Sequence, residues 1–212
     1  MGEPVLQEHH RRALEAQTRQ PLVQCFDNRY LADQHPDRPL EIVELGSFVG
    51  QSALALAKGF GPAGGKVFCI DTWKGTPGDE TAELAKNADI FEVFKRNVGD
   101  QLCKTIFPIT GTTLESAQKC ANEELDMVFI DADHSYEAVL ADIKAWLSKV
   151  KAGGIICGHD YGTIAYTGVT RAVAEVFQGA ITQMGDCLWV THIISHNKAE
   201  ENGQAVHEEA LA

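Results

Sequence analysis

From Leu40 onward the chain alternates short apolar runs with longer amphipathic segments, and this alternation constrains its fold more than any other feature. Short apolar runs suit buried parallel strands, whereas apolar side chains that recur every three or four residues suit helices that cover a sheet. Strands that alternate with helices form βαβ units, which build a parallel sheet. A length of 212 residues suits one such domain.

Seven strands are predicted, at residues 41–45, 66–71, 104–110, 126–131, 154–158, 181–185 and 188–194. Five helices are predicted between them, at residues 51–58, 81–97, 114–120, 136–150 and 169–177. Because only a short turn around Asp186 separates the last two strands, we expect them to form an antiparallel hairpin at one sheet edge. The predicted fold class is therefore α/β: a Rossmann-like, seven-stranded, mostly parallel sheet with helices on both faces and an antiparallel C-terminal hairpin.

Charge and composition restrict the partners and the cellular location. Residues 1–38 are predicted to form an N-terminal helical cap, residues 39–195 the α/β domain, and residues 196–212 a flexible tail. The formal net charge of −12 opposes binding to nucleic acid, because that affinity depends on cations that neutralise phosphates. The chain has no apolar window long enough to span a bilayer and no signal-peptide core at its start. We therefore expect a cytoplasmic protein without nucleic-acid or membrane partners.

A glycine-containing turn follows the first predicted strand. The sequence there reads Glu44-Leu45-Gly46-Ser47-Phe48-Val49-Gly50-Gln51-Ser52 and then continues into a helix. Glycine permits a tight turn and close approach of a ligand, and the start of a helix offers unpaired N–H groups. The turn therefore predicts a cofactor site, although such glycines also occur where a helix only packs closely on a strand.

The second and third predicted strands end in further polar residues. Asp71 ends the second strand, where a carboxylate can accept hydrogen bonds from both hydroxyls of a ribose; the alternative is a capping or solvated Asp. Trp73 either covers an adenosine or packs at the sheet edge. Thr112 and Thr113 follow the third strand and could flank an adenine ring, although Thr113 could equally be the N-cap of the next helix.

Acidic and histidine side chains follow the fourth and fifth predicted strands. The fourth strand ends in Asp131-Ala132-Asp133-His134, and the fifth ends in Gly158-His159-Asp160. Open α/β sheets bind ligands at the C-terminal ends of such central strands. Asp131, His159 and Asp160 offer two carboxylates and an imidazole, which suit a divalent ion such as Mg²⁺ or Mn²⁺. As alternatives, Asp133 only caps the following helix and His159 only bonds to a neighbouring loop.

Together these motifs resemble a known family. Residues 44–52, 68–73, 129–136 and 153–161 are similar to the class I S-adenosylmethionine-dependent methyltransferases, in the broad bacterial group related to catechol-type and macrolide sugar O-methyltransferases. The resemblance implies that the Gly46 turn and Asp71 hold S-adenosylmethionine and that Asp131 and the pair His159-Asp160 bind a metal. His134, three residues after Asp131, matches the position of the general base in these methyltransferases. Where this chain has His159-Asp160, catechol-type enzymes have Asp-Asn and macrolide enzymes have Glu-Asp.

The implied activity is metal-assisted transfer of a methyl group to an oxygen of a small hydroxylated acceptor. Residues 75–97, with the N-terminal helices, are expected to cover that acceptor. His134 and Asp131 are the predicted catalytic residues. The predicted cofactor-binding residues are Glu44, Gly46, Ser47, Gly50, Ser52, Asp71, Thr72, Trp73, Thr112, Thr113, Asp131 and His134.

Two other functions are weighed against this one. An NAD-dependent oxidoreductase would share the turn and the ribose acid, but the second glycine of GxGxxG is missing and the hairpin argues against it. A cofactor-binding module without catalysis is the non-enzymatic alternative. A homodimer is expected because it is the commonest oligomer.

Overall fold

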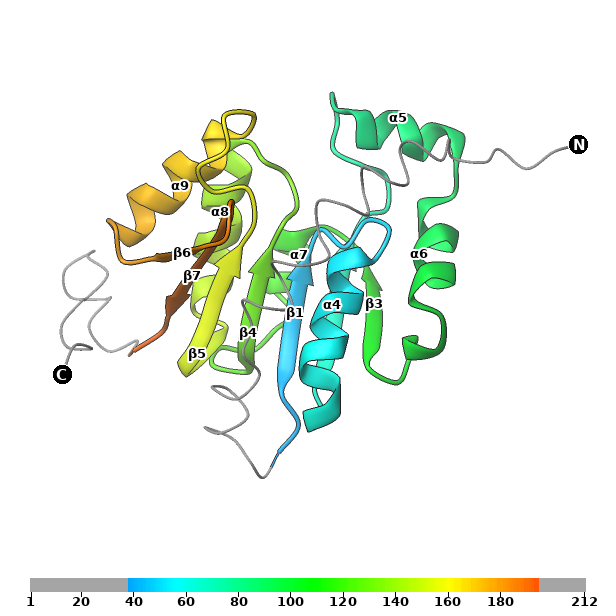
Figure 1. Ribbon diagram of the computed structural model, residues 1–212, viewed down its shortest axis with the longest axis horizontal. Helices are drawn as coiled ribbons and strands as arrows, with labels where there is room; N and C mark the ends of the chain where they lie inside the picture. The colour runs from blue at the N-terminus through cyan, green and yellow to red at the C-terminus, as the bar shows by residue number, and fades with distance from the viewer. Residues whose placement is uncertain (1–37, 195–212) are drawn as a thin grey trace, which may run out of the picture.

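A computed structural model of the chain describes residues 38–194 and confirms the predicted fold class. The seven strands form one sheet in the order β3-β2-β1-β4-β5-β7-β6 (Figure 1). Strands β1 to β5 are parallel, and the hairpin of β6 and β7 runs antiparallel, with β7 against β5. The strands are β1 (Glu41–Leu45), β2 (Lys66–Asp71), β3 (Ile106–Thr110), β4 (Leu125–Ile130), β5 (Val150–Gly158), β6 (Thr182–Met184) and β7 (Leu188–His192).

Helices cover both faces of the sheet (Figure 1). One face carries α4 (Gln51–Phe60) and α6 (Ile90–Val98), and the other carries α7 (Thr113–Ala117), α8 (Tyr136–Leu147) and α9 (Thr167–Phe177). Helix α5 (Glu80–Asn87) has no buried residue, and two short 3-10 helices span Gly61–Ala63 and Gly99–Gln101. Within residues 38–194, no helix is both long enough and apolar enough to cross a membrane.

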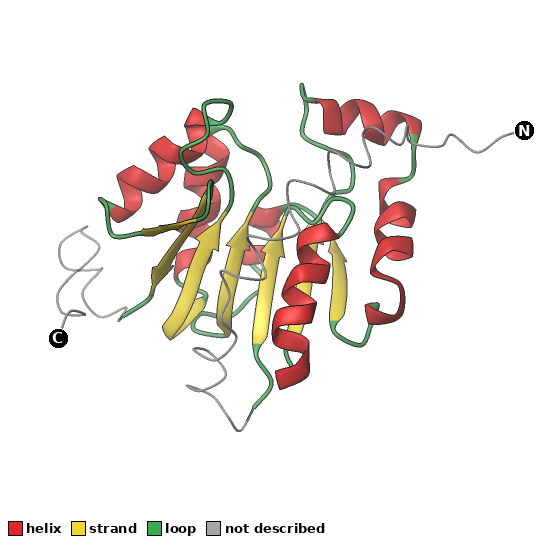
Figure 2. Ribbon diagram, in the orientation of Figure 1, coloured by secondary structure: helices red, strands yellow, loops and turns green. Residues whose placement is uncertain are grey.

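The core consists of two apolar clusters, one on each face of the sheet. Every residue of β4 is buried, and its side chains alternate between the clusters: Met127 and Phe129 pack toward α4, whereas Val128 and Ile130 pack toward α8. This arrangement explains why the central strands read as continuous apolar runs in the sequence. The loops that follow β1, β2, β4 and β5 gather where these parallel strands have their C-terminal ends (Figure 2).

The single helix predicted at residues 81–97 was wrong, because the structure divides it into α5 and α6. Ala88 has an extended backbone, and the Asp89 side chain accepts a hydrogen bond from the Glu92 backbone N–H at 3.0 Å. Asp89 therefore caps a new helix. The predicted helix at residues 136–150 also ends early, at Leu147, because Val150 already pairs with Leu125 as the start of β5.

The structure also decides two helix caps that the sequence left open as alternatives. Thr112, not Thr113, caps α7, and its hydroxyl accepts the Glu115 backbone N–H at 3.2 Å. Ser135, not Asp133, caps α8; the Asp133 carboxylate instead accepts the Ser135 backbone N–H at 2.7 Å. The predicted cap at residues 1–38, apart from Arg38, and the predicted tail at residues 196–212 lie outside the described residues.

Candidate active site

The glycines of the turn between β1 and α4 are required by close packing. Gly46 has φ +85°, and a Cβ atom there would lie 2.1 Å from the Asp131 carbonyl oxygen. Gly50 has φ +84°, and a Cβ atom there would lie 2.9 Å from the Phe94 ring. Only glycine combines this backbone conformation with such close neighbours. The turn therefore holds the end of β1 directly against the end of β4, where Asp131 begins the candidate catalytic loop.

Asp71 joins the loops that follow β1 and β2. One of its carboxylate oxygens accepts the Phe48 backbone N–H at 2.7 Å, and the other accepts the Trp73 backbone N–H at 2.6 Å. Burial raises the pKa of Asp71, and these backbone hydrogen bonds oppose the rise. Because an ionised carboxylate can accept about four hydrogen bonds, acceptor capacity remains for a ligand.

Glu44 is an acidic residue that is fully buried. It lies on β1 between Cys69 of β2 and Phe129 of β4, and it is 0% exposed. The side chains of Ser47, Ser52 and Cys69 face it, but neither carboxylate oxygen has a well-oriented partner among the described residues. Burial raises the pKa of Glu44 to about 7. A ligand that carries positive charge fits these unpaired acceptors, so the residues present suit S-adenosylmethionine.

Two other predicted cofactor residues contribute to packing. The Trp73 side chain is 6% exposed, packs against Phe91 and Phe94, and donates its ring N–H to the Phe48 carbonyl at 3.0 Å. Of the two roles considered for it, the structure shows packing. The Thr113 hydroxyl donates to the buried Asp142 carboxylate of α8 at 2.5 Å. Contact of either residue with a cofactor stays a prediction, as does that of Thr72, whose hydroxyl accepts the Lys74 backbone N–H at 3.2 Å.

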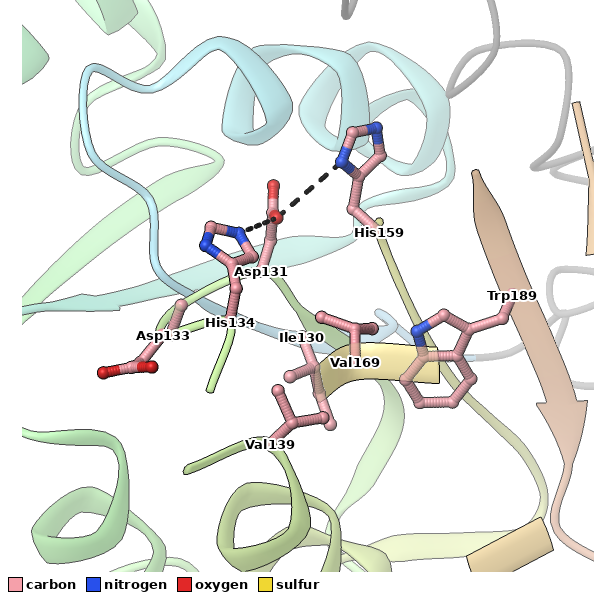
Figure 3. Close-up of a pocket in the computed structure, with 9 residues that line it drawn as sticks. Ile130, Asp131, Asp133, His134, Val139, His159, Val169 and Trp189 are labelled. Atoms are coloured by element: carbon pink, nitrogen blue, oxygen red, sulfur yellow. Dashed lines mark ion pairs between the residues drawn. The ribbon is translucent and has the colours of Figure 1, made fainter. Parts of the chain in front are cut away.

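The structure brings the predicted catalytic and metal-binding residues into one cluster. His134 Nε2 lies 3.0 Å from an Asp160 oxygen and 3.7 Å from an Asp131 oxygen. His159 Nδ1 lies 3.3 Å from the other Asp160 oxygen and 3.9 Å from Asp131. Figure 3 shows the Asp131 carboxylate between the two imidazoles, whereas Asp133 points away from them. Asp133 therefore does not belong to the cluster.

The ligand atoms of Asp131, His134 and Asp160 all lie within 4.8 Å of one another. Ligand atoms that share one ion at about 2.1 Å lie within about 4.2 Å of one another, and the contacts of His134 Nε2 with Asp160 at 3.0 Å and with Asp131 at 3.7 Å meet this condition. Asp160 adopts φ +62°, a rare conformation for a side chain other than glycine, and such positions concentrate at functional sites. The residues therefore fit a divalent cation.

The electrostatics of the cluster favour positive charge. Burial lowers the pKa of His134, but the carboxylates of Asp131 and Asp160 raise it more, to about 10. Burial raises the pKa of Asp160, but the two histidines lower it further, well below its usual range. A small cavity is lined on one side by polar residues that include Asp131, His134 and His159, and on the other by the apolar side chains of Ile130, Val139, Val169 and Trp189 (Figure 3). Apolar surroundings lower the local dielectric and strengthen these interactions.

The sequence reasoning missed two residues next to this cluster. The Tyr166 ring stacks on the His134 imidazole with 4.1 Å between ring centroids. The Cys187 thiol lies 3.0 Å from His159 Nε2. Tyr166 lies in the loop after β5, so its nearness to the site could have been expected. Cys187 gave no usable signal, because only the pairing of β7 with β5 brings it to His159.

Comparisons with known proteins identify a family and a fold. The profile of a family described as a methyltransferase domain matches residues 43–161, more than half of the chain. A protein of Sinorhizobium fredii (strain NBRC 101917 / NGR234), described as the uncharacterized protein y4gI, is 27% identical over 128 residues. The match covers 59% of this chain and 14% of that protein. The chain thus spans about one seventh of the length of this relative.

Solved structures share the fold. The O-methyltransferase NovP has a TM-score of 0.60 at 18% identity, over 82% of this chain and 78% of NovP. CalS11, a TDP-rhamnose 3′-O-methyltransferase of calicheamicin biosynthesis, has a TM-score of 0.54 at 17% identity, over 90% and 87% of the two chains. A SAM-dependent O-methyltransferase from Thermotoga maritima has a TM-score of 0.53 at 12% identity, over 86% and 70%.

The strand order and the antiparallel C-terminal hairpin are those of the class I methyltransferase fold, and the family match agrees. The chain belongs to the methyltransferase-domain family whose profile it matches.

Proposed function

We propose that this enzyme transfers the methyl group of S-adenosylmethionine to an oxygen of a small hydroxylated molecule with the assistance of a divalent cation. The observation that carries the proposal is the position of the Asp131, His134 and Asp160 cluster. It lies directly beside the cofactor turn, because Gly46 packs against the Asp131 backbone. Similarity in fold to O-methyltransferases such as NovP supports an oxygen acceptor.

Two loops and the end of β1 would hold the cofactor. Asp71 would accept the ribose hydroxyls, and Glu44 would face the positively charged part of the molecule. The remaining contacts would come from the other predicted residues: Gly46, Ser47, Gly50, Ser52, Thr72, Trp73, Thr112, Thr113, Asp131 and His134. When bound, S-adenosylmethionine supplies an electrophilic methyl group on a sulfonium. The main task of the protein is to hold the acceptor oxygen in line with that methyl group.

Asp131, His159 and Asp160 would hold the cation, Mg²⁺ or Mn²⁺, and this ion would supply Lewis-acid activation of the acceptor hydroxyl. His134 would take the proton of that hydroxyl at Nε2. In the metal-free protein the neighbouring carboxylates keep His134 protonated at neutral pH, since they raise its pKa to about 10. A cation near the carboxylates opposes that rise, so we expect His134 to act as a base only in the metal-loaded enzyme.

We propose a small-molecule acceptor rather than nucleic acid, a cytoplasmic location, and a homodimer. The net charge of −12 supports exclusion of nucleic acid. The second candidate, an oxidoreductase, is not favoured, because the family match is to methyltransferases.

The proposal is tested by incubating the enzyme with labelled S-adenosylmethionine and a panel of catechols and glycosides, with Mg²⁺, with Mn²⁺ and with a chelator. Methylation of at least one hydroxyl acceptor, lost in the chelator, is expected. Methyl transfer to nitrogen acceptors alone, or equal rates with the chelator, would contradict the proposal. Thermal-shift measurements that detect NAD binding instead of S-adenosylmethionine binding would favour the oxidoreductase.

A further inference from the structure

Cys187 is a half-buried thiol held beside the metal cluster by the fold itself. It lies in the turn between β6 and β7, and the pairing of Trp189 with Gly158 places that turn next to the end of β5. The Tyr161 backbone N–H donates to the Cys187 carbonyl at 2.9 Å, which fixes the turn further. The Cys187 sulfur lies 3.0 Å from His159 Nε2.

This thiol completes a second group of ligand atoms that shares Asp160 with the first. One ligand atom each of His159, Asp160 and Cys187 lies within 4.8 Å of the others, as in the group of Asp131, His134 and Asp160. The two oxygens of Asp160 face different histidines: one is 3.0 Å from His134 and the other 3.3 Å from His159. The cluster therefore offers sulfur and nitrogen donors on the side of Asp160 that faces His159.

The donor types decide which ion such a site prefers. Ligands bound to one ion at about 2.0 to 2.3 Å lie roughly 3 to 4 Å apart. The Cys187 sulfur and His159 Nε2, at 3.0 Å, meet this condition, and the ligand atoms of all three residues lie within 4.8 Å of one another. Mg²⁺ takes oxygen ligands in near-octahedral geometry, whereas thiolate and imidazole ligands favour Zn²⁺ and similar ions. A coordinated cysteine binds as the thiolate, and its proton leaves to solvent.

We propose that Cys187, with His159 and Asp160, ligates the divalent cation of this site, and that the site thereby selects a thiophilic ion such as Zn²⁺ over Mg²⁺. The inference deepens the proposed function, on which it rests for the presence of a cation. It differs from that proposal in the identity of the ion and in the use of Cys187.

Cobalt(II) is a suitable probe, because bonding to a thiolate gives it a near-ultraviolet charge-transfer band that oxygen and nitrogen ligands do not give. The metal-free full-length protein is titrated with Co²⁺ under reducing conditions. We expect this band to saturate at one ion per chain, to disappear when Zn²⁺ is added, and to persist in excess Mg²⁺. Calorimetry should show that the binding of Zn²⁺ releases a proton.

Cysteine variants assign the band to one sulfur. Cys187→Ser should abolish the band and weaken Zn²⁺ binding roughly ten-fold or more. Cys120→Ser is the matched control and should keep the band, because the Cys120 thiol faces Glu124 rather than the histidine cluster. Cys187→Ala serves as a second variant, and circular dichroism verifies that each variant is folded.

The two proposals fail in different ways. A band that survives in Cys187→Ser and Cys187→Ala, or that Mg²⁺ removes as readily as Zn²⁺, would overturn this inference. Methylation that needs Mg²⁺ in a wild-type protein without a thiolate band would overturn the inference and leave the proposed function intact. A Cys187-dependent band in a protein that methylates no hydroxyl acceptor would support the inference and contradict the proposed function.

Discussion

Glu44 is a fully buried acid, and none of the side chains that face its carboxylate is a well-oriented hydrogen-bond partner. A buried acid with few partners destabilises the folded state whenever it is ionised. Such an arrangement is retained where the charge is needed, which here we take to be the binding of a positively charged cofactor.

The pKa of about 7 at Glu44 gives the first prediction. Between the ordinary pKa of 4.5 and pH 7 the folded state holds more protons at Glu44 than the unfolded state, so stability falls as the pH rises. Glu44→Gln should therefore raise the free energy of unfolding by roughly 1 to 3 kcal/mol at pH 8 and by little near pH 4.5. Denaturant titrations at both pH values measure this difference.

The same Glu44→Gln variant should bind S-adenosylmethionine more weakly, so that stability and affinity change in opposite directions. Glu123→Gln, at an exposed position, is the control and should change neither. A loss of stability at pH 8 in Glu44→Gln would show that Glu44 has a stabilising partner and that the argument from burial is wrong.

Asp71 carries the second prediction. Hydrogen bonds to a charged group contribute about 1.5 to 3 kcal/mol, so Asp71→Ala should weaken S-adenosylmethionine binding roughly ten- to a hundred-fold in calorimetry. Because the carboxylate also accepts the Phe48 and Trp73 backbone N–H groups, thermal unfolding of the same variant must be measured. Unchanged affinity in the folded variant would remove Asp71 from the cofactor site.

His134 carries the third prediction. If it is the general base, His134→Ala should reduce turnover on a true acceptor by about 10² to 10⁴ and leave cofactor affinity nearly unchanged. Asp133→Ala is the control next to it and should keep its turnover, because the Asp133 carboxylate points away from the cluster (Figure 3). Near-full turnover in His134→Ala would leave alignment and metal activation to explain the chemistry.

At the scale of elements, the strands were easier to predict than the helices. The C-terminal ends of β1, β2, β4 and β5 were predicted to within one residue, since buried parallel strands give short apolar runs with polar residues directly after them. This accuracy placed Asp71, Asp131 and Asp160 correctly at the C-terminal ends of their strands. The position of Cys187 could not be predicted, because periodicity does not reveal that β7 inserts between β5 and β6.

The break between α5 and α6 left a signal that periodicity obscured. Asp89 is followed three residues later by Glu92, a pattern typical of a helix start, but the apolar spacing of residues 81–97 favoured one helix. Since Ile90, Phe94 and Val98 are the buried residues of α6, the break orients that helix toward Gly50 and the cofactor turn. The helix ends are thus set by local capping, which a search for apolar periods does not detect.

These two helices give the fourth prediction. Asp89→Ala removes the cap of α6 and should cost about 1 kcal/mol, a decrease of roughly 2 to 4 °C in Tm. Asp79→Ala removes the equivalent cap of α5, but α5 buries no residue, so the global Tm should change much less. Thermal unfolding of both variants tests the comparison. An equal decrease in the two Tm values would show that α5 belongs to the cooperative core.

At the scale of the whole molecule, the two apolar clusters that the described residues form have members from Leu40 to Ile193. The Arg38 guanidinium, just before this range, forms an ion pair with the buried Asp126 carboxylate, which also accepts the Glu41 backbone N–H at 2.8 Å. Arg38 therefore belongs with the sheet, although the sequence placed it in the N-terminal cap. Residues 38–194 contain the whole candidate site.

The last prediction concerns a chain of residues 38–194. It should unfold cooperatively and bind S-adenosylmethionine nearly as well as the full chain, because both clusters and the cofactor turn are retained. If residues 1–37 cover the acceptor, as the sequence predicts, turnover should fall roughly 10- to 100-fold through looser positioning. A chain that begins at Pro39 is the matched comparison and should be less stable, because it leaves the buried Asp126 without Arg38. Full turnover in the 38–194 chain would refute the prediction that residues 1–37 cover the acceptor. Failure of that chain to fold would refute the predicted domain boundary.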